Sequence, residues 1–348
     1  MTSKTPLVSV IISNQNGSRW LTRCFESLRC QTIVDQIEVI VADNRSSDKS
    51  VILANEALAN FPHGLVIENA KDLGFTGGSN AAARAACGEF IFITNNDVWL
   101  EPDCLEKLVA GTRTARANGS TPLVMNYHDD SYQDMGFFGF DLFGLSSPSH
   151  PPPRSGEIFI PGGCAYLIDR EFFFRIGAFD EAFYMYAEEA DLSWRAWIAG
   201  ARIVGVPEAR LHHRGAAGVN PAGGAQAVEY RTNDQKRFLT NRNSLLTLLK
   251  CGRNFLLLLV PLQMALVFIE SLIGALLLRR TSFFRKACFN AYRDCWRMRA
   301  HILSERRRIA GFRRRGDFWM LRFLRLRPNR WDEVKRTLKF GPPRVDAK

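Results

Sequence analysis

Apolar runs rich in β-branched residues alternate with helix-like stretches through the first 120 residues of the chain. The first helix-like stretch begins at Ser18 and carries apolar residues at helical spacing, and two later ones cover 51–61 and 79–87. Alternation of this kind predicts an α/β fold, in which a doubly wound, mostly parallel sheet is flanked by helices. The predicted strands are residues 7–13, 37–43, 64–69 and 89–95.

The alternation resumes after a long irregular stretch. Residues 127–156 contain repeated Phe-Gly pairs and the sequence SSPSHPPPR, a composition typical of a surface loop or of a lid on the acceptor side. Strand-like and helix-like patterns then continue to about residue 240. We therefore expect one compact α/β domain over residues 1–240 and a separate helical region over 241–348.

Polar side chains follow three of the predicted strands where each strand ends. Ligands of doubly wound sheets bind beyond the carboxyl ends of the strands, so these side chains are candidate binding residues. A carboxylate at Asp97 could hold a hard divalent cation, although a turn or helix-cap aspartate fits the same position. Asp43 has the same two interpretations, because Asp-Asn pairs are common in turns. The clusters are Asn14 and Asn16, Asp43 and Asn44, and Asn95, Asn96 and Asp97.

Two further short motifs could contact phosphate groups. Gly77 and Gly78 precede the predicted helix 79–87, where glycines let backbone amides approach an anion that the helix dipole also favours. The pair His212-His213 follows a strand-like stretch and could supply a metal ligand or a phosphate contact. Gly-Gly pairs are also common in plain loops, and an isolated histidine pair often has neither role.

Three acids open a helix predicted over residues 189–199, beside large aromatic side chains. They are Glu188, Glu189 and Asp191. Carboxylates are common in the first turn of a helix because the helix dipole favours negative charge there. A partly buried carboxylate in this position could instead act as a base.

In this order, the motifs resemble those of the inverting family 2 glycosyltransferases, which have the GT-A fold. The chain is most similar to the rhamnosyltransferase-like branch, which builds bacterial surface polysaccharides. The resemblance covers roughly residues 7–215 and rests on the segments VSVIISNQNG, IEVIVADNRSSDKS, DLGFTGGSN, FIFITNND, FDEAFYMYAEEADLSWR and ARIVGVPEARLHHRG.

The resemblance implies a site for a nucleoside-diphosphate-sugar donor, and the rhamnosyltransferase-like branch suggests dTDP-rhamnose. Asp43 corresponds to the acidic residue at the end of the second strand that contacts the nucleotide base. The Gly77-Gly78 segment should lie near the nucleotide-sugar. The residues expected to bind the donor are Asn14, Asp43, Asn44, Gly77, Gly78, Asn95 and Asn96.

The resemblance also implies a divalent cation, Mg²⁺ or Mn²⁺. Asp97 matches the last residue of the metal-binding DxD-type motif, which reads Asn95-Asn96-Asp97 in this chain. Asn95 stands where the family often has a carboxylate, which weakens the expected dependence on metal. His213, with His212 as second choice, matches the late histidine that can complete the metal–diphosphate site.

In the family, the acceptor-activating base lies in a Glu-Asp pair that opens the long helix. Here that pair is Glu188-Glu189, so the base position carries Glu189, and Asp191 is the alternative. The base would take the proton from an acceptor hydroxyl as that hydroxyl attacks the anomeric carbon. The acceptor is expected to be a glycan or a lipid-linked glycan of cell-surface polysaccharide synthesis.

The last hundred residues differ strongly in charge from the rest. The net charge of the chain is +11, but residues 251–348 carry +16 and residues 1–250 carry −5. Residues 254–278 contain no Lys or Arg and are mostly apolar. A basic segment beside such an apolar run favours an anionic membrane surface as its partner.

The apolar run is long enough to cross a bilayer, yet three features argue against a simple span. Pro261 interrupts it, and Gln263 and Glu270 lie inside it. A span would also put the Arg-rich segment 279–330 on the far side, against the positive-inside rule. We therefore expect helices in the membrane interface or a re-entrant pair broken at Pro261, on the cytoplasmic face of the cell membrane. The other interpretation is a buried core helix followed by a solvated basic face.

Two alternative functions stay open at this point. A nucleic-acid-binding protein could use the Arg-rich tail, although the acidic body and the apolar run do not suit it. A catalytically inactive glycosyltransferase-like scaffold is compatible with the departures at Asn95 and Glu189. If the chain is an active transferase, no nucleic-acid partner is expected.

Overall fold

The computed structural model describes residues 5–148, 155–215, 231–331, 334–335, 338 and 344–346. The chain forms two compact units. The first unit comprises Met1–Gly136, Ser149–Met185 and Ala201–Gly215, and the second comprises Phe137–Pro148, Tyr186–Gly200 and Ala216–Lys348. The domain boundary expected near residue 240 falls inside helix α7 (Asp234–Cys251) of the second unit.

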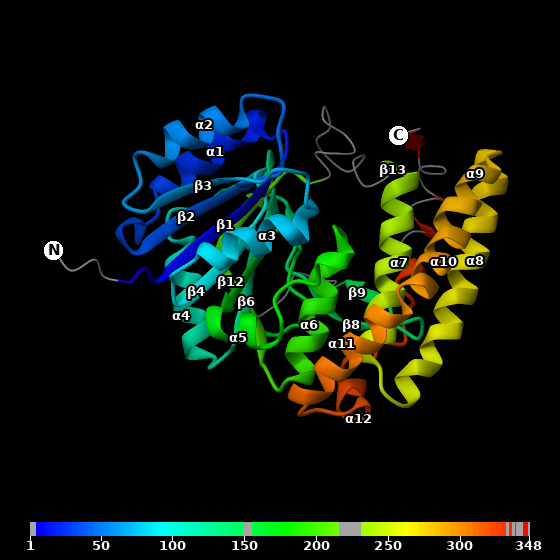
Figure 1. The fold of residues 1–348 in the computed structure, drawn as a ribbon. Coiled ribbons are helices and arrows are strands. Elements are labelled where there is room, and N and C mark those ends of the chain that lie inside the picture. The colour runs from blue at the N-terminus through cyan, green and yellow to red at the C-terminus, as the bar shows by residue number, and fades with distance from the viewer. Residues whose placement is uncertain are drawn as a thin grey trace. The chain divides into compact units, whose positions relative to one another are not determined.

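Four parallel strands form one half of the sheet in the first unit (Figure 1). Their side chains are largely β-branched and, in three of the four strands, almost wholly buried, which is typical of parallel strands covered on both faces. They occur in the order β4-β1-β2-β3, and the four strands predicted from the sequence are thereby confirmed. The strands are β1 (Val8–Asn14), β2 (Ile37–Asp43), β3 (Gly64–Glu68) and β4 (Phe90–Thr94).

The other half of the sheet is mixed, so the prediction of a mostly parallel sheet was wrong there. Strand β11 (Ala165–Asp169) lies antiparallel between β4 and β6 (Gly119–Asn126), and β12 (Ile203–His213) runs parallel to β6. Parallel neighbours need a crossover connection, usually a helix. No helix is described between β6 and β11, and the chain re-enters the sheet in the opposite direction. Strand β5 (Val98–Leu100) adds a further antiparallel pair with β12.

Five helices accompany the sheet in the described part of the first unit. In α1 (Ser18–Arg29) the buried residues are Leu21, Cys24, Phe25 and Leu28, so the apolar spacing read from the sequence marks its buried face. The other four are α2 (Ser50–Leu58), α3 (Gly74–Ala85), α4 (Cys104–Thr114) and α5 (Arg170–Arg175).

The stretch 127–156, expected to be a loop, contains short strands where it is described. Strand β7 (Tyr132–Asp134) pairs with β6, and β10 (Gly156–Glu157) pairs with β12. Strands β8 (Phe137–Phe140) and β9 (Ser146–Pro148) form a two-stranded antiparallel sheet in the second unit. The Phe-Gly pairs that suggested a loop therefore lie partly in a hairpin. The SSPSHPPPR sequence falls largely outside the described residues.

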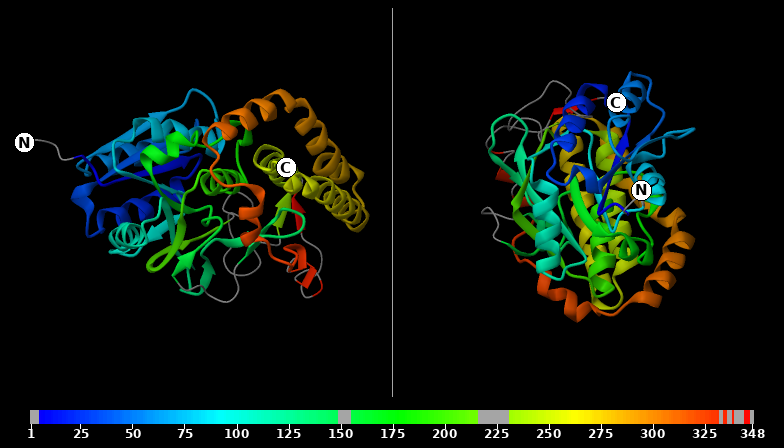
Figure 2. Two further views of the ribbon diagram at one scale, coloured as in Figure 1. Left: turned by 90° about the horizontal axis from the view of Figure 1, so that it is seen from below. Right: turned by 90° about the vertical axis from the view of Figure 1, so that its left-hand side faces the viewer.

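The second unit is mainly helical, as expected for the C-terminal region. Helix α7 packs against α6 and against the stretch that follows α8, and Figures 1 and 2 show α7, α8 and that stretch side by side. A two-stranded parallel sheet joins β13 (Arg231–Asn233) and β14 (Arg344–Asp346). The helices are α6 (Glu188–Ile198), α8 (Leu259–Leu278), α9 (Thr281–Phe284), a π-helical turn (Arg285–Asn290), α10 (Ala291–Arg297), α11 (Arg299–Phe312) and α12 (Asp317–Met320).

Helix α8 runs through Pro261 without a break, so the alternative of a helix pair broken at Pro261 was wrong. Pro261 lies in the first turn of the helix, after a short 3-10 segment, Phe255–Leu258. In that position the missing proline N–H has no helical carbonyl to reach, and the fixed φ suits the helix. The stretch Phe255–Leu258 together with α8 gives 24 residues, and an 18-residue part of it has a mean hydropathy of 2.3, so the segment is long and apolar enough to cross a membrane.

Candidate functional site

The polar residues that follow β1 and β2 form one hydrogen-bonded cluster. Asn14 and Asp43 are cross-strand partners, and Asn14 Nδ2 donates to Asp43 Oδ2 at 2.8 Å. Ser46 donates to the same carboxylate from its backbone N at 2.8 Å and from its hydroxyl at 2.6 Å. Asn96, from the segment after β4, donates to Asn14 Oδ1 at 2.7 Å. These hydrogen bonds link the carboxyl ends of three strands and hold Asp43 in one orientation.

The side chain of Asn44, also predicted to bind the donor, supports the start of α3. Its Nδ2 donates to the carbonyl of Gly74 at 2.9 Å and to Ser13 Oγ at 3.2 Å, and its Oδ1 accepts from Asn69 at 3.1 Å. These contacts occupy both ends of the amide group. Asn44 therefore fixes the position of α3 against the ends of β1 and β2.

The predicted loop at Gly77 and Gly78 was wrong, since both residues lie inside α3, which begins at Gly74. The first amides of the helix are bound within the protein: Gly74 N donates to Asp72 at 2.8 Å, and Thr76 N donates to the Tyr184 carbonyl at 3.1 Å. Gly78 packs so closely on Ser13 and Asn44 that a Cβ atom would overlap their side chains. Gly78 thus serves close packing of α3 on the ends of β1 and β2, whereas a Cβ atom on Gly77 would overlap Leu73 just before the helix.

Asp97 and His213 come together at the end of the mixed half of the sheet. Asp97 is only 4% exposed, and its Oδ1 lies 3.4 Å from His213 Nε2. The Asn95 amide lies 3.3 Å from the same nitrogen, and His213 Nδ1 lies 3.1 Å from Gln133 Oε1. A carboxylate and an imidazole far apart in sequence therefore meet, as predicted.

The two groups shift each other's pKa. Burial opposes ionisation of Asp97, but the charge and hydrogen bond of His213, with a contribution from Arg214, lower the pKa of that carboxyl below its ordinary value. Burial by itself would lower the pKa of His213, yet its contacts with Cys164 and Asp97 raise it well above its ordinary value. The result is a carboxylate–imidazolium pair in a buried setting.

His212 faces away from Asp97. Successive side chains of a strand point to opposite faces, so the neighbour of His213 cannot share its surroundings. The His212 ring stacks on Trp99 with a centroid distance of 3.6 Å, and its Nδ1 lies 3.2 Å from the Asn126 carbonyl. Of the two histidines, the structure brings His213 to Asp97.

The residues present fit a cation only in part. Asp97 and His213 supply one oxygen ligand and one nitrogen ligand, both of kinds that divalent metals accept. Among the described residues, no group of three or more His, Cys, Asp or Glu side chains could hold a metal. A cation at this position would need its remaining ligands from a bound diphosphate or from water.

Arg214 is a neighbour of this pair that sequence reasoning did not select. Its backbone N donates to the Asp97 carbonyl at 3.1 Å, and its guanidinium lies 4.9 Å from the centre of the Trp20 ring. The only available signal was its place directly after His213 in the LHHRG segment. Arg214 adds positive charge beside Asp97.

The acids that open α6 belong to the second unit. Three of the four residues before the helix have left-handed backbone conformations, at Tyr184 (φ 65°), Tyr186 (φ 68°) and Ala187 (φ 61°). Bulky residues rarely adopt this conformation, and it costs about 1–3 kcal/mol each. Asn243 on α7 donates to the Tyr186 carbonyl at 2.6 Å and so helps to hold this segment.

Glu188 is the most unusual of these acids. It is 8% exposed, and its Oε2 has no hydrogen-bond partner among the described residues. Burial, together with the nearby charge of Glu189, raises the pKa of Glu188 well above its ordinary value. Sequence reasoning grouped Glu188 with its neighbours but did not select it, because its burial depends on packing that the sequence does not reveal.

Asp191 lies in a buried ion network. Its Oδ2 pairs with Arg195 at 2.8 Å and its Oδ1 with Lys250 of α7 at 2.9 Å, and Lys250 lies 3.9 Å from Glu305 of α11. Asp191, Arg195 and Lys250 are almost completely buried. The carboxylate thus connects helices α6 and α7.

Replacing Glu188 by Gln should stabilise the protein at neutral pH but not in acid. Below about pH 4, the Glu188 carboxyl is protonated in both the folded and the unfolded state, so its ionisation does not affect stability. As pH rises toward the raised pKa of the folded state, the unfolded state loses its proton first, so stability of the wild type falls. Melting temperatures measured across this range should separate the two proteins only at the higher pH. A constant difference at every pH, or the same gain from the exposed Glu56→Gln, would contradict this account.

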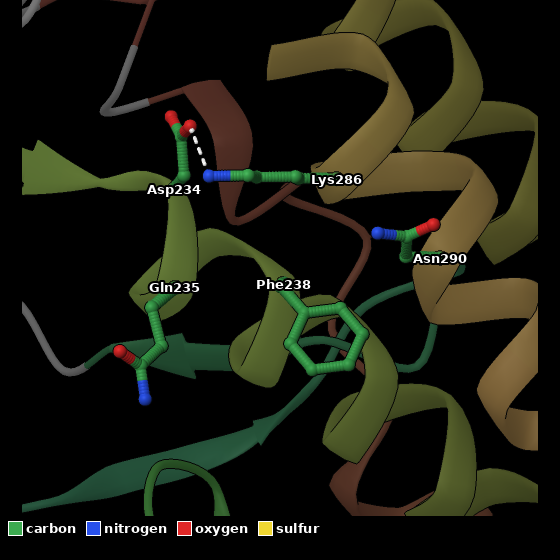
Figure 3. Close-up of a pocket in the computed structure, with 5 residues that line it drawn as sticks. All are labelled: Asp234, Gln235, Phe238, Lys286 and Asn290. Carbon is green, nitrogen blue, oxygen red and sulfur yellow. Dashed lines mark ion pairs between the residues drawn. The ribbon is translucent and has the colours of Figure 1, made fainter. Parts of the chain in front are cut away.

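A pocket of about 260 Å³ lies at the start of α7 in the second unit (Figure 3). Asp234 Oδ2 pairs there with Lys286 at 3.1 Å and with Arg280 at 3.3 Å. No site residue predicted from the sequence lines this pocket. Its lining residues are Asp234, Gln235, Phe238, Lys286 and Asn290.

Comparisons with solved structures agree with the architecture. The S. aureus TarS fragment 1–349, solved in complex with UDP-GlcNAc, aligns with a TM-score of 0.58 at 14% identity, covering 88% of this chain and 89% of that one. The mannosyltransferase PcManGT from Pyrobaculum calidifontis, solved with GDP-Man and Mn²⁺, aligns with a TM-score of 0.53 at 16% identity, covering 84% and 88%. The mixed sheet with flanking helices matches the GT-A fold.

Sequence comparisons match shorter parts of the chain than the structural ones do. A chondroitin synthase of Escherichia coli is 38% identical over 103 residues, which are 30% of this chain and 15% of the relative. This chain spans between 10% and 38% of the length of eight curated relatives that it matches. The sequence model described as "Glycosyl transferase family 2" matches residues 9–183, about half of the chain and the whole run from β1 to the segment before α6. The chain therefore belongs to glycosyltransferase family 2.

Proposed function

We propose that the protein transfers a sugar from a nucleoside-diphosphate-sugar to a hydroxyl group of a glycan or lipid-linked glycan, with inversion at the anomeric carbon. The observation that carries the proposal is the meeting of Asp97 and His213 in the unit that also contains the Asn14–Asp43–Asn96 cluster. Family membership supports it, as do the UDP-GlcNAc and GDP-Man bound by the two structural neighbours. For the donor sugar, rhamnose from dTDP-rhamnose is our proposal from the motif resemblance.

The first unit supplies the donor site in this proposal. Asp43, fixed by Asn14 and Ser46, can accept hydrogen bonds from the N–H groups of a nucleotide base. The cation, when bound, would neutralise charge on the diphosphate leaving group. Asp97 and His213 are the residues that would hold it, and the Mn²⁺ in the Pyrobaculum calidifontis neighbour supports this choice. Arg214 adds a second positive charge near the same place.

Glu189 is the base in this proposal. It would take the proton of the acceptor hydroxyl while that oxygen forms a bond to the anomeric carbon. The bond from the anomeric carbon to the diphosphate breaks in the same step, and its electron pair leaves with the nucleoside diphosphate. One displacement of this kind inverts the anomeric carbon. Asp191, already paired with two cations in a buried network, is less suited to accept a proton.

We also propose that the enzyme acts on the cytoplasmic face of the cell membrane, in cell-surface polysaccharide synthesis. The basic second unit supports a membrane location, since residues 251–348 carry a net charge of +16. Cations clustered near a bilayer bind anionic headgroups. The chondroitin synthase relative supports a polysaccharide as the product.

Binding of the donor should depend on Asp97. In the presence of Mn²⁺ or Mg²⁺, at least one of a set of UDP-, dTDP- and GDP-sugars should raise the melting temperature of the wild type by several degrees. A ligand at about 100 times its Kd adds about 2.7 kcal/mol of stability. Asp97→Asn keeps the shape of the side chain but removes the charge, and it should lose most of the shift.

The matched control is Asp35→Asn, because Asp35 is an exposed aspartate on a different segment of the same unit. It should keep the full shift. The role given to Asp97 would be overturned if the donor raised the melting temperature of Asp97→Asn as much as that of the wild type. It would also be overturned if chelation of the cation left the wild-type shift unchanged.

A further inference from the structure

Helix α8 buries polar side chains and exposes apolar ones, which is the reverse of what is expected for a surface helix in water. Its most buried residues are Gln263, Val267 and Ser271, spaced four residues apart. Gln263 is 1% exposed, and neither polar atom of its side chain has a hydrogen-bond partner among the described residues. A water-soluble surface helix buries its apolar stripe and exposes its polar one.

The opposite side of α8 is an apolar stripe without a charged or polar side chain. Its members recur at helical spacing, and the large ones are between 43% and 69% exposed. Only 22% of the most apolar part of the segment is buried. The stripe consists of Leu258, Pro261, Leu262, Ala265, Phe268, Ile269, Leu272, Ile273, Leu276 and Leu277. An exposed stripe of this length marks a surface that meets something apolar.

The one acid in α8 is neutralised within the protein. Glu270 Oε1 lies 2.7 Å from Nε of Arg330, and both side chains are largely buried. The pair lets Glu270 stay in the helix without carrying an uncompensated charge toward an apolar phase. Glu270, which in the sequence argued against a simple transmembrane span, is therefore compatible with contact between α8 and a membrane.

The neighbours of α8 exclude a simple transmembrane arrangement. The chain turns back after α8, so Phe284 packs on Phe268 with a centroid distance of 5.3 Å and the Tyr292 hydroxyl donates to the Met264 carbonyl. This returning stretch, residues 281–297, exposes Arg285, Lys286 and Arg293. A helix that crossed the bilayer with this stretch attached would carry those cations into the hydrocarbon region.

We propose that α8 lies along one leaflet of an anionic bilayer, with the apolar stripe in the acyl region and the polar side packed on the protein. Both ends of the helix then stay on the same side of the membrane. Exposed cations of the returning stretch and of α11 meet anionic headgroups, and the exposed Phe289 and Trp296 lie among them at the boundary. The proposal rests on the second unit alone and does not depend on the sugar transfer proposed above.

The first test is flotation of the full-length protein with vesicles of phosphatidylcholine mixed with phosphatidylglycerol. The wild type should float with them, and Ile269→Glu/Ile273→Glu should lower the vesicle partition coefficient about tenfold or more. These side chains are 53% and 51% exposed, so the substitutions should leave the fold intact, which an unchanged circular dichroism spectrum checks. The control Ile52→Glu changes an isoleucine that is 59% exposed on α2 and should float like the wild type.

Equal flotation of the double variant and the wild type would overturn the proposal, as would a wild type that fails to bind the vesicles. If the wild type binds no vesicles and is a dimer in solution, and the double variant is a monomer, the apolar stripe would instead be the contact with a second copy of the chain.

A second test separates a helix that lies in the leaflet from one that crosses it. In a background with the exposed Cys30 and Cys87 replaced by Ser, single cysteines are placed by Arg253→Cys and Arg279→Cys at the two exposed ends of the apolar segment. After binding to preformed vesicles, both should react with a membrane-impermeant maleimide. Protection of one end until detergent is added would contradict the proposal.

Discussion

Glu189→Gln should abolish sugar transfer while leaving nucleotide-sugar binding almost intact. The amide has nearly the shape of the carboxylate but cannot accept the proton of the acceptor hydroxyl, so only the chemical step is affected. General-base catalysis contributes about 10²–10⁴-fold to a rate, and a loss of that size is expected in kcat. Transfer is measured as product formation with the acceptor present, and binding as the melting-temperature shift with the donor.

Two other substitutions make this result specific. Glu56→Gln changes an exposed glutamate on α2 and should keep full activity. Glu188→Gln tests the buried neighbour, whose raised pKa would also suit a proton acceptor. Full activity in Glu189→Gln, combined with loss in Glu188→Gln, would transfer the role of base to Glu188.

Lys250→Met should destabilise the protein by about 3–5 kcal/mol. It removes a buried partner of Asp191 and leaves that carboxylate paired with Arg195 alone in the interior, and breaking a buried ion pair costs about this much. Methionine is close in length to the lysine stem, so the loss should come from the charge rather than from a cavity. Urea unfolding of the full-length protein measures the change.

A surface ion pair gives the matched control. Lys107 pairs with Asp103 at 2.7 Å, but both side chains are about two-fifths exposed, and water and salt screen such surface pairs. Lys107→Met should therefore have a small effect. Equal losses in the two variants would show that the Asp191 network does not stabilise the second unit.

The parallel half of the sheet could be predicted from the sequence because its evidence is local. Strands β1, β2, β3 and β4 are short β-branched runs with helix-like stretches between them, and their polar ends meet because parallel strands share an edge. The link between Asn14 and Asp43 follows from that register alone. The pairing of Asp97 with His213 was expected only from the motif resemblance, since nothing local connects the two.

The features that sequence reasoning missed depend on long-range packing. Gly77 and Gly78 suggested a loop because glycine disfavours helix interiors, whereas Tyr184 and Asp72 satisfy the first amides of α3 and let it begin at Gly74. The antiparallel entry of β11 follows a connection in whose described residues no helix occurs. The cations around Asp191 come from Arg195 and from Lys250 on a different helix, and no local pattern predicts their burial.

A chain that cleaves nucleoside-diphosphate-sugars at the anomeric carbon must release the nucleoside diphosphate, and this release can be measured. Purified full-length protein is incubated with UDP-, dTDP- and GDP-sugars, with Mn²⁺ or Mg²⁺ and with membrane extract as the source of acceptor. We expect release from at least one donor by the wild type and a strongly reduced rate in Asp97→Asn and in Glu189→Gln. Absence of release from every donor, or equal release by the wild type and both variants, would contradict the proposed function.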